Sequence, residues 1–358
     1  MIKKIIATVF AFTVVFSASC SKEKWEGKIS IEKGVIVIEN KGPGLWGEKS
    51  SEKIKFIENL SLGVEEGEEY LMFHSYLNVA VDSKLNIYIL DRRNHRLLKF
   101  GKEGNFIWKA GKKGQGPGEL QYPRNIALTP TEDIAVQDGS SIHFFDKDGS
   151  YEKTVKLKGS FIRFLILPDG RLLMSSIVRG QLGIVAEYHS IEGKFLKKFP
   201  YEYRYGPKFS LGAGIFYGGE FKVFNSKIYL SLPGSYEIRE YDLEGKLLRK
   251  IKRGFKIKPA NLKITGGSVW AGPSDVSGPC FLFQGKMMVN LLNIVEEKEE
   301  NKYESKKFLD FFNEKGQFLG TYKMPEIKTL STVDSKGNFY FVQWEPYPKL
   351  IRLILELQ

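Results

Sequence analysis

Short apolar segments recur along the chain, each directly after a polar turn residue. Six are near-continuous runs of β-forming residues: Ile87–Leu90, Ile134–Val136, Leu172–Met174, Ile228–Leu230, Met287–Val289 and Phe339–Phe341. Apolar runs of this length, bounded by turn residues, are typical of strands buried on both faces. They return at intervals of roughly 40 to 60 residues, which indicates an internal repeat.

A second pattern accompanies these strands. A residue that is usually aromatic is followed by three residues, at least one of them charged, and then by glycine. It occurs at Phe100–Gly104, Phe145–Gly149, His189–Gly193, Tyr241–Gly245 and Phe312–Gly316. Because glycine enters the left-handed backbone region without steric cost, each segment predicts a hairpin turn. One turn follows each of the first five apolar strands, and none follows the sixth.

Four strands per repeat at this period predict an all-β fold, a six-bladed β-propeller. The sixth repeat lacks its outer hairpin, and residues 31–38 are similar to residues 313–319. We therefore expect an N-terminal strand within residues 28–39 to join the last blade and close the ring, which removes exposed strand edges. The expected organisation is a signal peptide (1–19), a tether with the closing strand (20–68) and the propeller (69–358).

The first twenty residues have the three regions of a secretory signal. Lys3 and Lys4 precede an apolar run, Ile5–Phe16, and small residues lead to Cys20. The run is shorter than a membrane span, which needs about 20 residues. Small residues directly before a cysteine resemble the bacterial lipobox, which implies lipidation of Cys20 and an exported protein anchored on the periplasmic or surface side of the envelope. Ordinary cleavage nearby and an uncleaved anchor are the alternatives.

The net charge limits which partners are expected, and the cysteine content limits which disulfides can form. The formal net charge is +12, but the lysines are scattered, which favours an ordinary solvated surface. The alternative is affinity for an anionic partner such as lipid headgroups or acidic polysaccharide. We expect no nucleic-acid partner for an exported protein. Cys280 is the only cysteine besides Cys20, so we expect it to be free and buried.

Residues 78–123 carry the most specific motif. A strand ending at Asp91 leads into a polar turn with Arg93, Asn94 and Arg96, and a Gly-Pro-Gly-Glu connector follows at 116–119. This resembles the NHL repeat, and residues 25–150 are similar to exported bacterial six-bladed propeller lipoproteins. The resemblance implies a toroid with a central channel.

No catalytic motif is present in the sequence. The glycine-rich segment Gly111–Gly118 lacks the Gly-Lys-Ser/Thr ending of a phosphate-binding loop, so we interpret it as a connector between blades. The four histidines form no His-Glu-x-x-His motif, and no Gly-x-Ser-x-Gly nucleophile segment occurs. We therefore predict no catalytic residues.

Aspartates are the candidate metal ligands. Related six-bladed hydrolases bind a divalent cation in the channel, and carboxylate oxygens suit calcium. The residues that could line the channel are Asp82, Asp91, Asp138, Asp275 and Asp334. The alternative, which we favour, is that these side chains cap turns by accepting backbone hydrogen bonds. No other cofactor is expected.

Three functions remain open. The first is a membrane-tethered binding module or scaffold that holds an envelope protein, peptide or glycan. The second is a metal-dependent hydrolase or lyase with its site in the channel, and the third is a structural part of an envelope assembly. Tyr201, Tyr203 and Tyr205 could form a contact patch or pack between blades. The charged segment Glu296–Lys307 is expected to be an insertion in the fifth blade that forms an exposed strand extension or a mobile hairpin tip.

Overall fold

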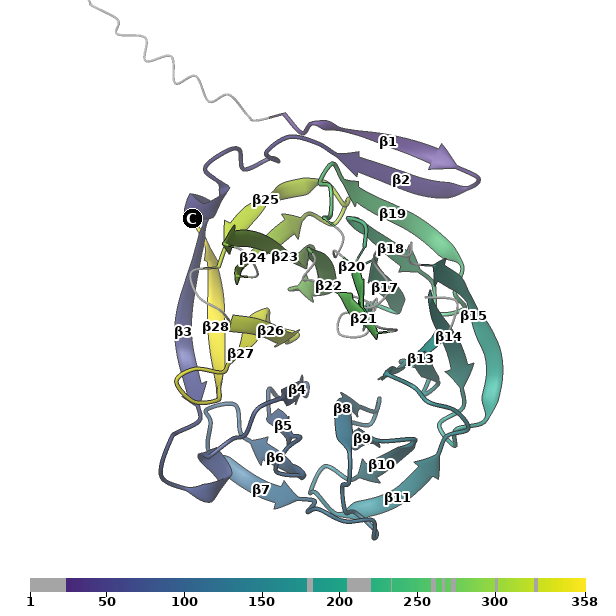
Figure 1. Cartoon of the computed structure of the whole chain (residues 1–358), viewed down its shortest axis with the longest axis vertical. Coiled ribbons are helices and arrows are strands. Elements are labelled where there is room, and N and C mark those ends of the chain that lie inside the picture. The colour runs from purple at the N-terminus through teal and green to yellow at the C-terminus, as the bar shows by residue number, and fades with distance from the viewer. Residues whose placement is uncertain are drawn as a thin grey trace, which may run out of the picture.

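The computed structural model describes residues 24–178, 183–204, 220–232, 234–258, 262–265, 268–271, 275–299, 302–324 and 328–358. Six sheets are arranged in a ring, which confirms the six-bladed β-propeller (Figure 1). None of the helices in these ranges is long and apolar enough to cross a membrane.

Each blade has four strands. In blades one to five these strands follow one another in the chain from the channel outward, whereas the outer strand of blade six comes from the N-terminal part of the chain. Blade one contains β4 (Leu77–Val81), β5 (Ile87–Asp91), β6 (Arg96–Phe100) and β7 (Phe106–Ala110). Blade two contains β8 (Pro123–Leu128), β9 (Ile134–Asp138), β10 (Ser141–Phe145) and β11 (Tyr151–Lys156). Blade three contains β12 (Arg163–Ile166), β13 (Leu172–Val178), β14 (Gly183–His189) and β15 (Phe195–Arg204). Blade four contains β16 (Glu220–Phe224), β17 (Lys227–Leu232), β18 (Glu237–Tyr241) and β19 (Leu247–Arg253). Blade five contains β22 (Val276–Phe283), β23 (Met287–Glu299), β24 (Lys302–Phe312) and β25 (Phe318–Lys323). Blade six contains β26 (Lys328–Val333), β27 (Asn338–Gln343), β28 (Lys349–Leu357) and β3 (Ile54–Leu62).

The repeats predicted from the sequence have fixed places in the blades. The six apolar runs are the second strands, and in β5 every residue is buried because the neighbouring blades cover both faces of the sheet. The five glycine turns join third and fourth strands. Their glycines have φ between 78° and 90°, in the left-handed region that favours glycine.

The strand that closes the ring is β3, not residues 28–39. β3 pairs antiparallel with β28 and supplies the outer strand of blade six, so closure by an N-terminal strand is confirmed. The prediction that residues 28–39 supply this strand was wrong. They form a hairpin of β1 (Gly27–Glu32) and β2 (Val35–Asn40), and β2 pairs in parallel with β19 of blade four. The local hairpin was predicted, but its partner was not.

Residues 24–76, here called the N-terminal belt, contact four blades in succession. After β2 joins blade four, the backbone N–H of Trp46 donates to the carbonyl oxygen of Leu319 in blade five, 2.7 Å away. A short 3-10 helix (Ser50–Lys53) then leads into β3 of blade six. A second one (Glu69–Leu71) lies against blade one. The belt therefore fastens the last blades of the ring to the first.

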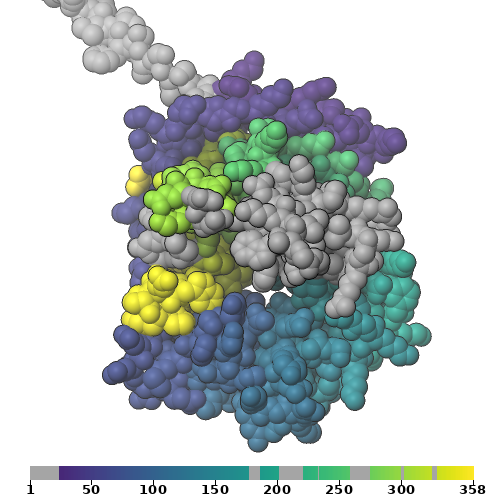
Figure 2. Space-filling view, viewed as in Figure 1, coloured from purple at the N-terminus to yellow at the C-terminus, as the bar shows by residue number. Residues whose placement is uncertain are grey.

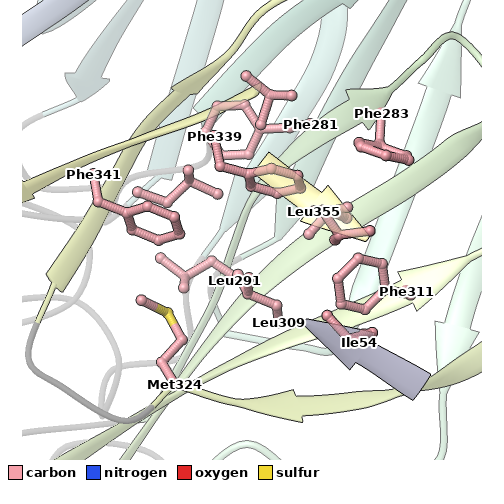
Figure 3. Packing of buried hydrophobic residues seen from close by; sticks show 13 residues of the cluster. Ile54, Phe281, Phe283, Leu291, Leu309, Phe311, Met324, Phe339, Phe341 and Leu355 are labelled. Atoms are coloured by element: carbon pink, nitrogen blue, oxygen red, sulfur yellow. The ribbon is translucent and has the colours of Figure 1, made fainter. Parts of the chain in front are cut away.

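Tight apolar clusters fill the spaces between neighbouring blades. Between blades five and six, the closing strand contributes Ile54 to a cluster with Phe281 and Phe283 of β22, Phe311 of β24 and Phe339 of β27 (Figure 3). Phe311 and Phe339 are completely buried. Burial of one such side chain stabilises the fold by about 1.5–3 kcal/mol, so ring closure is also a matter of core packing.

Blade five carries two additions. β23 and β24 form a long hairpin whose outer part holds the charged segment Glu296–Lys307, as expected. In this hairpin Glu296 pairs with Lys298 at 2.8 Å and with Lys306 at 2.6 Å. A separate two-stranded sheet, β20 (Leu262–Thr265) and β21 (Ser268–Ala271), precedes the blade.

Candidate functional site: a basic hollow beside the channel

The central channel contains a cavity of about 90 Å³ lined from five blades. Its described lining residues are Asn78, Val79, Asn125, Ile126, Arg163, Phe164, Leu165, Leu173, Ser175, Phe221, Lys222 and Ser331. Amides, hydroxyls and two cations make up the polar part of this lining, and none of these residues is acidic. The channel wall therefore suits a polar or anionic group better than a divalent cation.

Hydrogen bonds hold part of the channel wall in place. Asn125 Nδ2 donates to Gln137 Oε1 at 2.7 Å and to the carbonyl oxygen of Ile162 at 2.8 Å. Gln137 Nε2 donates to the carbonyl oxygen of Phe161. These bonds tie blade two to the segment that leads into blade three. Asn78 Oδ1, by contrast, is buried and accepts no hydrogen bond from any described residue. It is a free acceptor in the channel wall.

A larger hollow, of about 450 Å³, lies on the same side of blades one and two as the β5–β6 turn. We call it the basic hollow, and its lining residues are Tyr76, Arg92, Arg93, His95, Lys113, Gln121, Tyr122, Pro123 and Arg124. They come from the end of the belt, the β5–β6 turn, the glycine-rich connector and the start of β8. Arg124 directly precedes Asn125 of the channel cavity in β8, so one strand contributes to both sites.

Tyr76 organises the arginines of the basic hollow. The Arg92 and Arg93 guanidinium carbons each lie 5.5 Å from the centroid of its ring, within cation–π range. Arg92 Nε also donates to the carbonyl oxygen of Pro123 at 2.9 Å. The Tyr76 ring is 53% exposed and lies 6.2 Å from that of Trp344 in blade six. Aromatic and cationic groups are thus presented together to solvent.

The positive charges of the basic hollow act on one another. Burial lowers the pKa of Arg92, and the nearby charges of Arg124, Arg163 and Arg93 lower it further. An arginine stays protonated at neutral pH nonetheless. Within the described residues, no carboxylate forms an ion pair with Arg92, Arg93 or Arg124. As far as the described residues show, no ion pair offsets the positive charge of this cluster, which an anionic ligand would relieve.

Asp82 and Asp334, two of the predicted site residues, occupy equivalent turns. Oδ1 of Asp82 accepts the backbone N–H groups of Lys84 and Asn86, and its Oδ2 accepts the Asn86 amide and the Tyr88 hydroxyl. Asp334 makes the same four contacts with Lys336, Asn338 and Tyr340. Both carboxylates are therefore engaged in the turns between first and second strands.

Asp91 is the centre of a buried clamp formed by the NHL-like turn. Nε and Nη2 of Arg96 each lie 3.0 Å from Asp91 Oδ2, which also accepts the amide of Asn94. Arg96 Nη1 donates to the carbonyl oxygen and to Oε1 of Glu69, and Nη2 donates to the carbonyl oxygen of Met72. Three of the four turn residues thus bind the belt to blade one, whereas Arg93 faces the basic hollow.

Asp138 and Asp275 also accept backbone hydrogen bonds. Asp138 accepts the N–H groups of Gln121 and Tyr122, and its Oδ2 lies 3.5 Å from His143 Nε2. Asp275 accepts the N–H of Lys258 and that of Val295, both at 2.9 Å. The structure does not bring the five predicted aspartates together. In the described ranges, no three His, Cys, Asp or Glu side chains are grouped so that they could hold a metal ion.

Other predicted residues have different outcomes. Among the described residues Cys280 forms no disulfide, and it is completely buried, as expected. Cys20 and the side chains of Tyr201, Tyr203 and Tyr205 lie outside the described residues, so their roles remain predictions. A buried carboxylate that was not singled out, Asp310, accepts hydrogen bonds from Arg253 Nη1 and from the hydroxyl groups of Tyr236 and Thr321.

The sequence alone did not identify the basic hollow. Tyr76, Arg92, Lys113 and Arg124 are spread over nearly fifty positions, and no dense basic run marks them. A signal was present in the pair Arg92–Arg93, whose polar turn has two arginines in succession. Only the ring geometry brings that turn beside Arg124 of the next blade.

Comparisons with known proteins agree with this fold. A 33% identical match of 101 residues links 28% of the chain to the Drosophila melanogaster protein brain tumor, of which it spans only 9%. Among solved structures, a Bacteroides fragilis protein classed as exported has a TM-score of 0.59 at 12% identity, covering 90% of this chain and 99% of the other. A DUF4221 family member from Bacteroides vulgatus has a TM-score of 0.56 at 11% identity, covering 86% of this chain and 100% of the other.

At these identities the solved structures show a shared fold and nothing further. The family assignment comes from the sequence. Residues 66–252, more than half of the chain, match the model of a family described as 6-bladed beta-propeller, DUF5128. The chain therefore belongs to the DUF5128 family of six-bladed β-propellers.

Proposed function

We propose that this protein is a binding module of the bacterial cell envelope, tethered through Cys20, that holds an acidic polysaccharide on the basic hollow. The observation that carries the proposal is the uncompensated cluster of Arg92, Arg93 and Arg124 around Tyr76. Clustered like charges cost free energy in the unliganded protein, and a bound anion offsets that cost.

The side chains of the basic hollow match carboxylate-bearing ligands. The planar guanidinium group of arginine presents paired donors that suit a carboxylate bidentately. Arg93 and Arg124 are exposed, so their donors can turn toward a ligand. Lys113, on the glycine-rich connector, adds a further cation to the lining. A repeating polyanion could contact several of these groups at once.

Exposed rings favour a polysaccharide over a small inorganic anion. The Tyr76 and Tyr122 side chains are 53% and 65% exposed, large fractions for residues of this size. Their rings combine an apolar face with a hydroxyl group, the combination that is enriched where proteins bind partners. The channel cavity, which Asn125 lines directly after Arg124 in β8, offers room for a polar substituent of the ligand.

The cellular location is part of the proposal. Support comes from the basic start, the apolar run and the small residues before Cys20. The Bacteroides fragilis neighbour of similar fold is classed as exported. A single lipid anchor at Cys20 would place the basic hollow among envelope polysaccharides. Substitution of Cys20 by Ser should abolish lipid labelling, and unchanged labelling would contradict the anchor.

The binding test is a charge-reversal series on the full chain, with polygalacturonate as probe and calorimetry as readout. Arg93→Glu combined with Arg124→Glu should weaken binding at least about tenfold, because two ion pairs are replaced by repulsions. The matched control is Lys147→Glu with Lys246→Glu, two exposed lysines in hairpin turns with the same change in net charge. An equal loss of affinity in the two double variants would mean that overall charge explains the effect, and it would contradict the assignment of the binding site to the basic hollow. Tighter binding of polyglutamate than of polygalacturonate would contradict the proposal that the ligand is a polysaccharide.

A further inference from the structure

The N-terminal hairpin leaves one strand edge open. β1 pairs with β2, β2 pairs with β19, and among the described strands none pairs with the other edge of β1. The hairpin forms the rim of the molecule, at the purple end of the colour scale (Figures 1 and 2). All other blades of the ring end in an outer strand that is curved around the toroid, whereas β1 extends the sheet of blade four beyond it.

The exposed side chains of this hairpin are unusually apolar. Ile29, Ile31 and Ile36 are 53%, 75% and 44% exposed, and Ile31 lies directly opposite Ile36. Edge strands are normally protected by short length, by charged side chains, by proline, by a bulge or by covering elements, and of these β1 has the charged residues Lys28 and Glu32. β1 has no proline, and its pairing with β2 runs through six residues without a register shift. Such an edge is suited to pairing with another strand.

The sequence of β1 is self-complementary when two copies run antiparallel. We propose that this edge binds the same edge of a second copy of the chain, with the two-fold axis at Ser30. Lys28 then lies opposite Glu32 of the partner subunit, and Ile29 lies opposite Ile31 of the partner subunit. The axis repeats both pairs, so the contact contains two ion pairs and two apolar pairs, and it is isologous.

The hairpin turn fixes which backbone groups face the open edge. Lys33 and Gly34 form a two-residue turn with φ of 49° and 80°. Residues that flank such a turn form a hydrogen-bonded pair, and these pairs alternate along the ladder. The backbone groups of Ile29 and Ile31 therefore point away from β2. In the proposed register both isoleucine pairs can exchange backbone hydrogen bonds across the interface.

Two neighbouring registers also let the backbone groups of the open edge form hydrogen bonds, but both are less favourable. An axis at Ile29 would place Glu26 opposite Glu32 of the partner subunit, which is repulsive. An axis at Ile31 would place Ile29 opposite Lys33 of the partner subunit and would leave Lys28 without an acidic partner. Charge and apolarity together thus select the axis at Ser30. The pairing involves only the hairpin and is independent of the basic hollow.

The contact is small, so we expect weak association in dilute solution. The lipid anchor proposed at Cys20, on which this step rests, would change this, because it would confine both copies to one surface and raise their effective concentration. Gly27 is only seven positions after Cys20, and an extended chain of that length spans about 24 Å. The open edge would therefore stay close to the membrane, where partner copies are concentrated.

Disulfide trapping tests the register directly. In the proposed pairing Ser30 faces Ser30 of the partner subunit in a non-hydrogen-bonded pair, with Cα atoms about 4.5 Å apart, a distance that a disulfide bridges. The Ser30→Cys variant of the full chain, oxidised in cell membranes, should form covalent dimers. The Lys28→Cys variant should not, because its two copies would lie four positions out of register. Wild-type protein gives the baseline. Absence of Ser30→Cys dimers, or equal cross-linking of both variants, would overturn the proposal.

A charge-swap series supplies an independent test that needs no cysteine. Lys28→Glu and Glu32→Lys should each weaken dimerisation of the detergent-extracted full chain, measured by sedimentation, by about tenfold, since two attractive pairs become repulsive. The double variant restores both pairs and should recover wild-type association, and a mixture of the two single variants should form heterodimers. A double variant no better than the singles would contradict the pairing.

Discussion

Asn40 Oδ1 accepts a hydrogen bond from the backbone N–H of Phe318 at 2.8 Å, although the two residues are 278 positions apart. The same side chain accepts the indole N–H of Trp25, and its Nδ2 donates to the carbonyl oxygens of Lys252 and Gly316. One buried amide thus joins the belt to blades four and five. Four bonds to a fully buried group make its position highly specific.

Replacement of Asn40 by Ala should destabilise the protein by about 2–4 kcal/mol, because it leaves several buried backbone groups without partners. The loss is measured by urea unfolding of the full chain. Lys41→Ala, an exposed neighbour in the belt, is the matched control and should change the free energy of unfolding by less than about 0.5 kcal/mol. Similar values for the two variants would contradict the bridging role of Asn40.

The Asp91–Arg96 clamp predicts strong coupling between belt and blade one. Arg96→Met should cost about 3–5 kcal/mol, since it leaves the buried Asp91 carboxylate without a cationic partner. Asp91→Asn should cost less, about 1–3 kcal/mol, because Arg96 keeps its ion pair with Glu69. The double variant should be less destabilised than the sum of the singles by at least about 1 kcal/mol. Strict additivity in the double-mutant cycle would mean that the two side chains act separately.

Asp138 predicts a stability difference that depends on pH. Burial would raise its pKa, but hydrogen bonds from His143 and from the N–H groups of Gln121 and Tyr122 outweigh burial and lower the pKa. The ionised group therefore stabilises the fold above the ordinary aspartate pKa of about 4, and this contribution is lost as the pH falls through the lowered value.

Accordingly, Asp138→Asn should be less stable than wild type by about 1–2 kcal/mol at pH 7. The gap should narrow progressively below about pH 5. Denaturation at a series of pH values measures it, with the exposed Asp148→Asn as control. A gap that stays constant down to pH 3 would show that the charge of Asp138 contributes nothing.

Local features of the fold could be predicted from the sequence. The second strands are continuous apolar runs because both faces are buried, and glycine marks the turns because the backbone there requires positive φ. Such signals lie within a few residues. The hairpin at Lys33–Gly34 was found in the same way, by its similarity to residues 313–319.

Partner choice could not be predicted in this way. The hairpin joins β19 because Ile38 packs beside Ile251 and Gly316, and because Asn40 reaches Phe318, contacts between distant parts of the chain. The aspartates were ambiguous for a similar reason, since a turn cap and a metal ligand look alike in sequence. The basic hollow depends on four segments, the end of the belt, the β5–β6 turn, the glycine-rich connector and the start of β8, which the ring brings together.

The most direct measurement compares two polysaccharides that differ only in charge. Binding of the full chain to polygalacturonate and to its methyl ester is measured by calorimetry at one ionic strength. If the arginines around Tyr76 bind carboxylates, the free acid should bind at least about tenfold more tightly than the ester, because esterification removes the acceptor charge. Equal affinities, or no binding of the acid, would contradict the proposed function.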